Sequence, residues 1–201
     1  MGCFIDQSME GQLQGVFSRM ERPLVLEVQG ASAHYGRDLL AAMGELCALT
    51  PKLSLKSSDG GEDLPCVRIL NEEGVWTGLS FHGIPGGREF TAFMLAIYNA
   101  SGPGQSIDPA LAERIRAIRH PVSMRILVSL ECMACPELVI PSQRAAALNP
   151  LVSCEAYDAA LFPALARKIG ARSVPALKAG DLPVEFGIMP LERVVSLLER
   201  A

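Results

Sequence analysis

The sequence lacks the features that mark membrane, nucleic-acid-binding and secreted proteins. Its apolar runs are far shorter than the ~20 residues of a membrane helix. Basic residues are not in excess, because 18 Lys and Arg stand against 22 Asp and Glu, which argues against nucleic-acid binding. Residues 1–6 show no signal-peptide pattern. We therefore expect a cytoplasmic protein that contacts neither membrane nor nucleic acid.

Cysteine is sparse, and only one pair is closely spaced. Of the six cysteines, Cys132 and Cys135 alone lie near each other in the sequence. A chain of 201 residues with 49% hydrophobic residues builds its own core and needs no disulfide framework. A zinc site usually needs four ligands, and the sequence has neither a second cysteine pair nor a histidine cluster. The pair therefore favours redox chemistry, with zinc binding and a purely structural role as the alternatives.

Hydrophobic periodicity predicts an α/β chain made of two similar halves. After a leader helix at 8–20, the first half reads β-α-β-β-β-α at 24–28, 32–49, 53–56, 66–70, 75–81 and 88–99. After a helix at 109–118, the second half reads β-α-β-α-β-β-α at 122–130, 132–148, 151–156, 162–169, 175–178, 184–186 and 191–199. The glycine-rich connector at 101–104 predicts a boundary, with one unit at 1–104 and the other at 105–201.

The dithiol motif CMACP, at 132–136, follows an expected strand and opens an expected helix. Sulfurs at i and i+3 lie on one helix face. In the first turn, free N–H groups and the helix dipole stabilise a thiolate at Cys132, although Glu131 beside it opposes the charge. Cys135 lies one turn deeper and can close a disulfide on Cys132. We therefore predict that Cys132 attacks a partner disulfide and Cys135 resolves the mixed disulfide.

The two halves can be overlaid, with Val28 on Val128 and Pro65 on Pro175. The segment Ser32-Ala33-His34-Tyr35 then falls on the dithiol motif, and it contains no thiol. The first unit is therefore expected to be inactive in disulfide exchange at that position.

Five short segments carry a family resemblance: LECMACP at 130–136, LNP at 148–150, SVPA at 173–176, GIPGGREFT at 83–91 and LP at 64–65. Together they resemble the N-terminal module of the flavoprotein subunit of bacterial alkyl hydroperoxide reductase, over about residues 9–200. The resemblance implies two fused thioredoxin-like folds in tandem, of which only the second is redox-active.

The resemblance also implies two further site residues. A proline at the position of Pro175 is cis in such proteins, faces the dithiol and leaves backbone free to pair with a substrate; a trans proline at a strand start is the alternative. Glu89 is placed across the cleft between the units, where a buried carboxylate exchanges a proton with Cys135. The alternative for Glu89 is a helix-start glutamate favoured by the dipole.

The family module takes electrons from a dithiol in the flavin-bearing part of its protein and reduces a peroxiredoxin disulfide. This sequence contains no Gly-x-Gly-x-x-Gly after a strand, so we expect no dinucleotide domain and no FAD or NAD site. The expected donor is a separate flavoprotein disulfide reductase, and the acceptor is a peroxiredoxin or another disulfide protein. The alternatives are a general glutaredoxin-like protein disulfide reductase with broad protein substrates and a non-redox protein-binding module.

Overall fold

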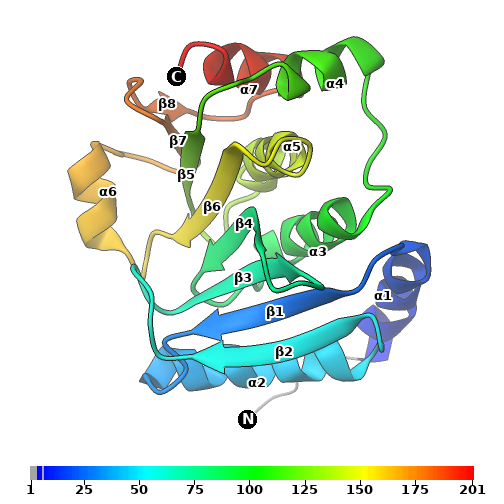
Figure 1. Ribbon diagram of the computed structural model, residues 1–201. Helices are drawn as coiled ribbons and strands as arrows, with labels where there is room; N and C mark the ends of the chain where they lie inside the picture. Colours follow the sequence, from blue (N-terminus) through cyan, green and yellow to red (C-terminus); the bar gives the residue numbers. More distant parts are fainter. Residues whose placement is uncertain (1–3, 6) are drawn as a thin grey trace.

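Eight strands form one continuous mixed sheet in the computed structural model, which describes residues 4–5 and 7–201 (Figure 1). The first part of the chain forms α1 (Gln7–Arg19), β1 (Leu24–Gln29), α2 (His34–Ala48), β2 (Leu53–Ser58), β3 (Cys66–Asn71), β4 (Trp76–His82) and α3 (Glu89–Ser101). The second part forms α4 (Pro109–Arg116), β5 (Val122–Val128), α5 (Pro136–Ala146), β6 (Val152–Asp158), α6 (Pro163–Ile169), β7 (Ala176–Ala179), β8 (Glu185–Phe186) and α7 (Leu191–Leu198). Each expected helix and strand is present, with its ends shifted by a few residues.

The strand order repeats along the sheet. It runs β2-β1-β3-β4 in the first unit and β6-β5-β7-β8 in the second. In each unit, the first strand pairs in parallel with the second and antiparallel with the third. The units join through the parallel pair β4–β6, so they share one sheet. The expected boundary at 104/105 falls in the connector between α3 and α4 and stays a prediction.

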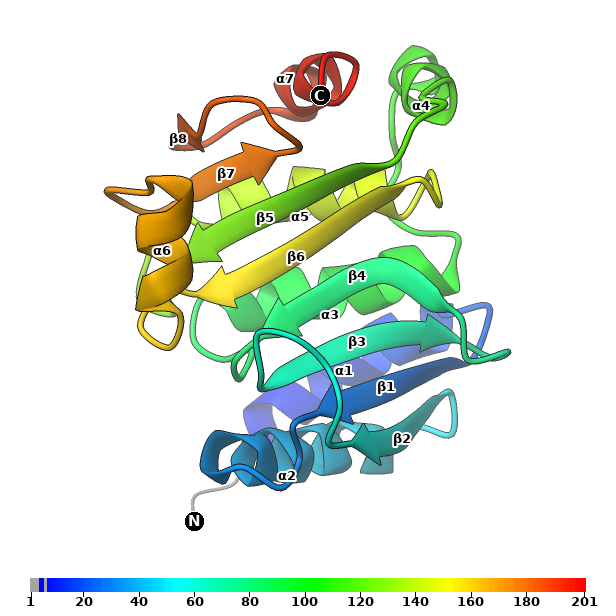
Figure 2. The same ribbon diagram turned by 60° about the vertical axis from the view of Figure 1, so that its left-hand side comes forward.

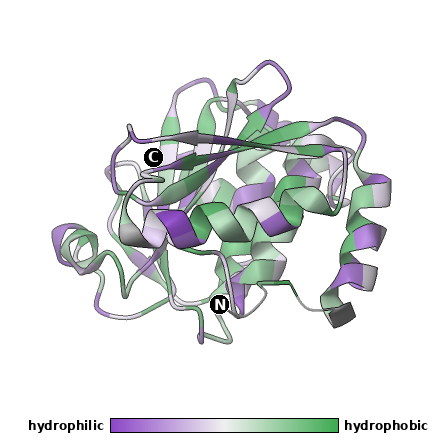
Figure 3. Cartoon of the chain, turned by 90° about the horizontal axis from the view of Figure 1, so that it is seen from below, coloured by the Kyte–Doolittle hydropathy of each residue, from purple (hydrophilic) through white to green (hydrophobic). Residues whose placement is uncertain are grey.

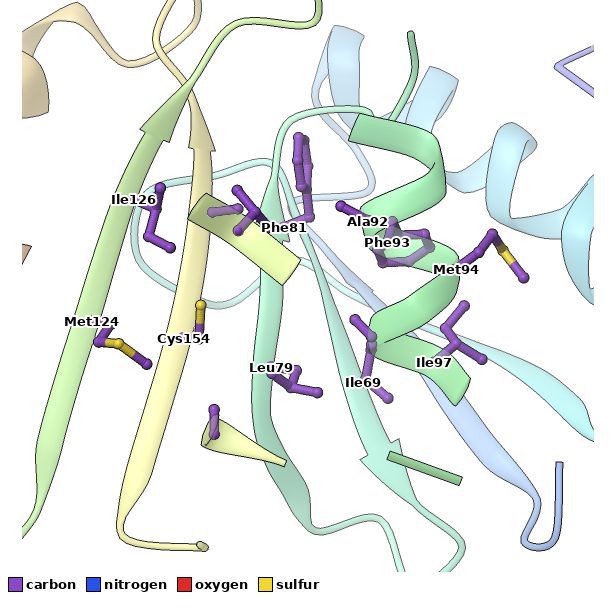
Figure 4. Close-up of a cluster of buried hydrophobic side chains, with 14 of the residues drawn as sticks. Ile69, Leu79, Phe81, Ala92, Phe93, Met94, Ile97, Met124, Ile126 and Cys154 are labelled. Atoms are coloured by element: carbon purple, nitrogen blue, oxygen red, sulfur yellow. The ribbon is translucent and has the colours of Figure 1, made fainter. Parts of the chain in front are cut away.

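The main core lies between one face of the sheet and the helices packed on it. Figure 4 shows Ile69 and Leu79 of the sheet with Phe93 and Ile97 of α3 in one cluster of buried hydrophobic side chains. Helices α3 and α5 lie on this face, whereas α6 covers the opposite face beside β5 and β7 (Figure 2). In Figure 3, hydrophobic residues concentrate in the strands and in the helices packed against them. This arrangement agrees with the alternating and helical hydrophobic patterns of the sequence.

Local signals explain where α4 begins and where α6 ends. The Asp108 side chain accepts hydrogen bonds from the backbone N–H groups of Ala110 and Leu111, at 2.9 and 3.2 Å, and caps α4. Gly170 adopts the left-handed conformation (φ 79°) and ends α6, because glycine pays no Cβ penalty there.

The loops that carry the candidate site all lie at one edge of the sheet. Strands β1, β4, β5 and β6 run in the same direction, as their parallel and antiparallel pairings require. Their carboxyl ends therefore meet at that edge, which also receives the starts of the antiparallel strands β3 and β7. The dithiol loop, the segment between β4 and α3, and both Pro65 and Pro175 are gathered there.

Candidate active site

Cys132 and Cys135 are joined by a disulfide, with their Cα atoms 5.5 Å apart. The two cysteines differ in accessibility, because Cys132 is partly exposed and Cys135 is completely buried. Met133, between them, is 67% exposed. The disulfide therefore presents one sulfur-bearing residue to a partner and keeps the other inside the core.

The dithiol lies before its helix, which corrects the expectation of a helix over 132–148. Helix α5 begins at Pro136, and Cys135 is its N-cap residue. Cys132 belongs to the preceding turn, where its N–H donates to the Ser129 carbonyl at 3.0 Å. Proline suits the first helical position, because its φ is already helical and its missing N–H costs no intrahelical bond. The helix N-terminus still adjoins the dithiol through Cys135, but Cys132 is not in the first turn as expected.

Pro175 is buried, and the Val174–Pro175 peptide is cis, as expected. Ala176, the next residue, pairs with Leu127 near the end of β5. The dithiol loop directly follows that end of β5. Pro175 and the loop therefore lie next to the same strand end.

Glu89 is completely buried at the start of α3. Neither of its carboxylate oxygens has a hydrogen-bond partner among the described residues. Burial raises the pKa of Glu89 from 4.5 to about 7, because desolvation disfavours the charged form. A carboxyl group in this state can gain or lose a proton near neutral pH, which is the property that the sequence-based interpretation requires of it.

The segment before Glu89 contacts the dithiol loop directly. The Arg88 N–H donates to the Leu130 carbonyl at 2.9 Å. Gly87 has a positive φ of 55°, and a Cβ added there would collide with the Leu130 carbonyl oxygen. The first unit therefore supports the loop of the second. The family resemblance placed this segment near the dithiol, and the structure adds the backbone contact that holds the two together.

The first unit has the same backbone arrangement around the matching position, but no thiols there. The Leu64–Pro65 peptide is also cis. The Pro65 carbonyl accepts from the Gly83 N–H at 2.9 Å, as the Pro175 carbonyl accepts from the Gly187 N–H at 3.0 Å.

The turn that carries Cys132 also has a counterpart in the first unit, where the Ala33 N–H donates to the Gly30 carbonyl at 3.2 Å. Aligned by this turn, Ala33 and Gly36 stand in the places of Cys132 and Cys135. This alignment lies one residue from the sequence overlay, and it also contains no thiol. His34 begins α2, and its side chain lies outside the described part of the structure.

The other described cysteines are free thiols. Cys66 and Cys154 are buried, and Cys47 is half-buried. Burial raises the pKa of Cys47 to about 11 and that of Cys66 to about 12. Burial also raises the pKa of Cys154, and the nearby Glu155 and Glu89 carboxylates add to this effect. Such thiols carry little thiolate at neutral pH. Cys3 lies outside the described residues.

The described residues contain no group of three or more His, Cys, Asp and Glu side chains arranged to hold a metal ion. In the same part of the chain, no helix has the length and apolar character to cross a membrane.

Curated relatives match nearly all of this chain, but the match covers only part of their own length. No protein-family model matches it. The F subunit of the Pseudomonas aeruginosa alkyl hydroperoxide reductase is 28% identical over 195 residues, which cover 97% of this chain and 37% of that protein. A NADH dehydrogenase of Bacillus subtilis is 27% identical over 192 residues, which cover 96% of this chain and 37% of that protein. The chain thus spans little more than a third of the length of these curated relatives.

Solved structures match over nearly the full length of both chains. The NTD_N/C domain of alkylhydroperoxide reductase AhpF from Enterococcus faecalis has a TM-score of 0.90 and 32% identity, covering 96% of this chain and 99% of that chain. A protein disulfide oxidoreductase from Aeropyrum pernix shares the fold, with a TM-score of 0.82 and 20% identity over 98% of this chain and 94% of that chain. The expected tandem thioredoxin-like fold is confirmed, and the chain belongs to the family of AhpF N-terminal domains.

Proposed function

We propose that this thiol–disulfide oxidoreductase relays two electrons from the dithiol of a flavoprotein reductase to the disulfide of a peroxiredoxin. The observation that carries the proposal is the Cys132–Cys135 disulfide, with one partly exposed and one buried cysteine. The partners are those that the names of the AhpF relatives suggest. Among the described residues, three cysteines are free and have pKa values raised by burial. Free thiols suit a reducing compartment, which we take to be the cytoplasm.

Exchange proceeds in two steps that conserve atoms and electrons. The Cys132 thiolate attacks the acceptor disulfide, forms a mixed disulfide and expels one acceptor thiolate, which takes up a proton. Cys135 then loses its proton, and its thiolate attacks the Cys132 sulfur. This closes the Cys132–Cys135 disulfide and releases the second acceptor thiol. The donor dithiol later reduces the disulfide by the same two steps in reverse.

Glu89 is the proposed proton acceptor for Cys135. A buried thiol resists ionisation, so a nearby base assists the resolving step. Glu89 is buried without a hydrogen-bond partner among the described residues, and its pKa of about 7 lets it take and return a proton. The contact between Arg88 and Leu130 ties the start of α3 to the dithiol loop, which supports this role.

Pro175 is the proposed substrate-facing residue of the neighbouring loop. It lies beside the end of β5, and its own carbonyl is already bonded to the Gly187 N–H. The preceding backbone, at Val174, is the part we expect to pair with an extended substrate segment, as the family resemblance implies.

The dithiol is the proposed redox centre of this chain, without FAD or NAD. We expect the purified chain to show no flavin absorbance near 450 nm and no oxidation of NAD(P)H when it is alone. A yellow protein with bound flavin would contradict this part of the proposal.

The relay is tested by reconstitution from purified components. The chain is mixed with a flavoprotein disulfide reductase, a peroxiredoxin, NADH and a hydroperoxide, and NADH oxidation is followed at 340 nm. We expect peroxide-dependent oxidation that requires the chain and is absent with Cys132→Ser. Rapid reduction of insulin disulfides together with slow reduction of the peroxiredoxin would instead indicate a general protein disulfide reductase.

A further inference from the structure

A small pocket opens beside the dithiol loop, where the two units meet. Its volume is about 480 Å³, and it is lined by Gly87, Arg88, Leu130 and Glu131. This volume lies in the usual range for small-molecule sites. Leu130 and Glu131 directly precede the attacking Cys132, whereas Gly87 and Arg88 belong to the unit without thiols. Both units therefore build the pocket, within one residue of the reacting sulfur.

The two walls of the pocket are held together by backbone. The Arg88 N–H donates to the Leu130 carbonyl at 2.9 Å, and Gly87 packs against the same carbonyl. Substitution of the Arg88 or Glu131 side chain leaves these backbone contacts in place. The pocket can therefore be tested by variants that keep its walls.

Two opposite charges line the pocket without pairing. The side chains of Arg88 and Glu131 are both exposed. Among the described residues, the ion pairs and side-chain hydrogen bonds involve neither the guanidinium of Arg88 nor the carboxylate of Glu131. A guanidinium and a carboxylate that remain free in one small pocket complement a ligand with a carboxylate and an ammonium group close together.

We propose that Arg88 and Glu131 bind the α-carboxylate and α-ammonium groups of a cystine-type disulfide and present its sulfur to Cys132. In cystine the ammonium and the carboxylate are both attached to the Cα atom, and this Cα atom is two bonds from sulfur. Such a ligand suits a pocket whose charged residue Glu131 directly precedes Cys132 in the chain. The inference rests on the proposed thiol–disulfide exchange and adds a small-molecule substrate class to it.

The reaction needs only the reduced dithiol and the disulfide. The Cys132 thiolate attacks one cystine sulfur, and one cysteine leaves as a thiolate that takes up a proton. Cys135 loses its proton and its thiolate attacks the Cys132 sulfur, which releases the second cysteine. One cystine is reduced to two cysteines, and the protein dithiol is oxidised to the Cys132–Cys135 disulfide.

Four small disulfides separate the contributions of the two charges. Cystine carries both groups, 3,3′-dithiodipropionate the carboxylate alone, cystamine the ammonium alone, and bis(2-hydroxyethyl) disulfide neither. The pre-reduced full chain is mixed with each one in a single-turnover experiment, and the thiols released are quantified after an acid quench. Because the four differ in intrinsic reactivity, each variant is compared with the wild-type chain for the same disulfide.

We expect Arg88→Ala to slow the two carboxylate-bearing disulfides by about three- to fivefold relative to the hydroxyethyl control, and Arg88→Lys to restore part of the loss. Glu131→Gln slows the two ammonium-bearing disulfides by a similar factor. These factors correspond to exposed ion pairs, and added salt reduces them. Arg19→Ala and Glu113→Gln, at exposed sites outside the pocket, serve as matched controls that remove the same charges.

The outcomes distinguish failure of this inference from failure of the proposed function. If all four disulfides react but the two variants change every rate by the same factor, the pocket does not recognise the charged groups and the inference is wrong. If Arg88→Ala slows cystamine as much as dithiodipropionate, the effect is on the Cys132 thiolate and the inference is also overturned. If none of the four disulfides oxidises the dithiol, the thiol–disulfide exchange itself fails.

Discussion

The two units share a frame but differ at the places where chemistry occurs. Each has the same strand order, a cis proline before its third strand and a glycine N–H bonded to that proline's carbonyl. The second unit carries Cys132 and Cys135 where the first has Ala33 and Gly36. Both units therefore have the same fold, although only the second carries the dithiol.

A second difference concerns the connection between the second and third strands. In the second unit this connection contains α6, which covers the opposite face of the sheet (Figure 2). In the first unit it is a loop, and His82 holds it through Nδ1, 2.7 Å from the Asp63 carbonyl. The first unit thus has neither this helix nor thiols at the matching position. Its segment at Arg88 and Glu89 nevertheless lies against the dithiol loop of the second unit, through the Arg88–Leu130 backbone contact.

The largest expected effect comes from removing either thiol of the second unit. Cys132→Ser should lower disulfide exchange on the order of 1,000-fold or more, as loss of a nucleophile does in other enzymes. Cys135→Ser should instead accumulate a mixed disulfide with the acceptor through Cys132, because the resolving sulfur is missing. Mass spectrometry under non-reducing conditions locates the adduct. An adduct on Cys135, or activity that survives both substitutions, would reverse the assignment or refute the redox interpretation.

The next effect concerns the carboxyl group that the first unit contributes. Glu89 has a pKa of about 7 in the folded chain, compared with 4.5 for a free side chain. Between these values the folded chain holds the proton more tightly than the unfolded chain. The free energy of unfolding therefore falls as the pH rises through this window, by about 3 kcal/mol in total.

Glu89→Gln should remove this pH dependence, and it should slow the resolving step most at a pH above 7, where the wild-type carboxylate is charged. Urea unfolding at pH 5 and pH 8 measures the stability, and the exchange rate is followed over the same range. Glu137→Gln, at an exposed position of α5, is the control. An unchanged pH slope for Glu89→Gln would show that the buried carboxyl does not titrate in this window.

A smaller effect is expected at Gly36, which stands in the first unit at the place of Cys135. Gly36 packs so tightly that an added Cβ would collide with the Gly30 carbonyl oxygen. Gly36→Ala should therefore cost about 1–3 kcal/mol of stability through overpacking. Gly44→Ala, in the same helix, meets only Leu55 at an ordinary 3.8 Å and should stabilise the chain by up to about 1 kcal/mol. The denaturant midpoint of each variant measures its stability. Equal shifts of the two midpoints would mean that the fold tolerates a Cβ atom at Gly36.

The smallest effect is expected at the cysteine that follows Pro65. Cys66 is buried, donates a hydrogen bond to the Gln29 side chain at 3.4 Å, and has a pKa raised by burial to about 12. Cys66→Ser keeps the hydrogen-bond donor and should leave the exchange rate within about twofold of wild type, since surface and minor core changes are worth little. A large loss of exchange in this variant would mean that the first unit takes part in the redox chemistry.

Local sequence patterns predicted most of the fold. Alternation in strands such as β5, helical periodicity in α2, and glycine or proline at element ends all act over a few residues, so they can be read without the tertiary structure. The dithiol motif and the absence of thiols at 32–35 can likewise be read from a few adjacent residues. The start of α5 was predicted wrongly, because a proline in a helical pattern can occupy either the interior or the first turn. At Pro136 the first position was favoured.

The sequence by itself determined two α/β units in tandem and a single dithiol, because periodicity and cysteine spacing are properties of short segments. Only the tertiary structure decided that β4 and β6 merge the units into one sheet, that Glu89 is buried without a partner among the described residues, and that Arg88 lies beside Glu131. These features depend on contacts between residues about 40 to 75 positions apart. Such contacts form only when the whole chain packs, and no local pattern encodes which side chains they bring together.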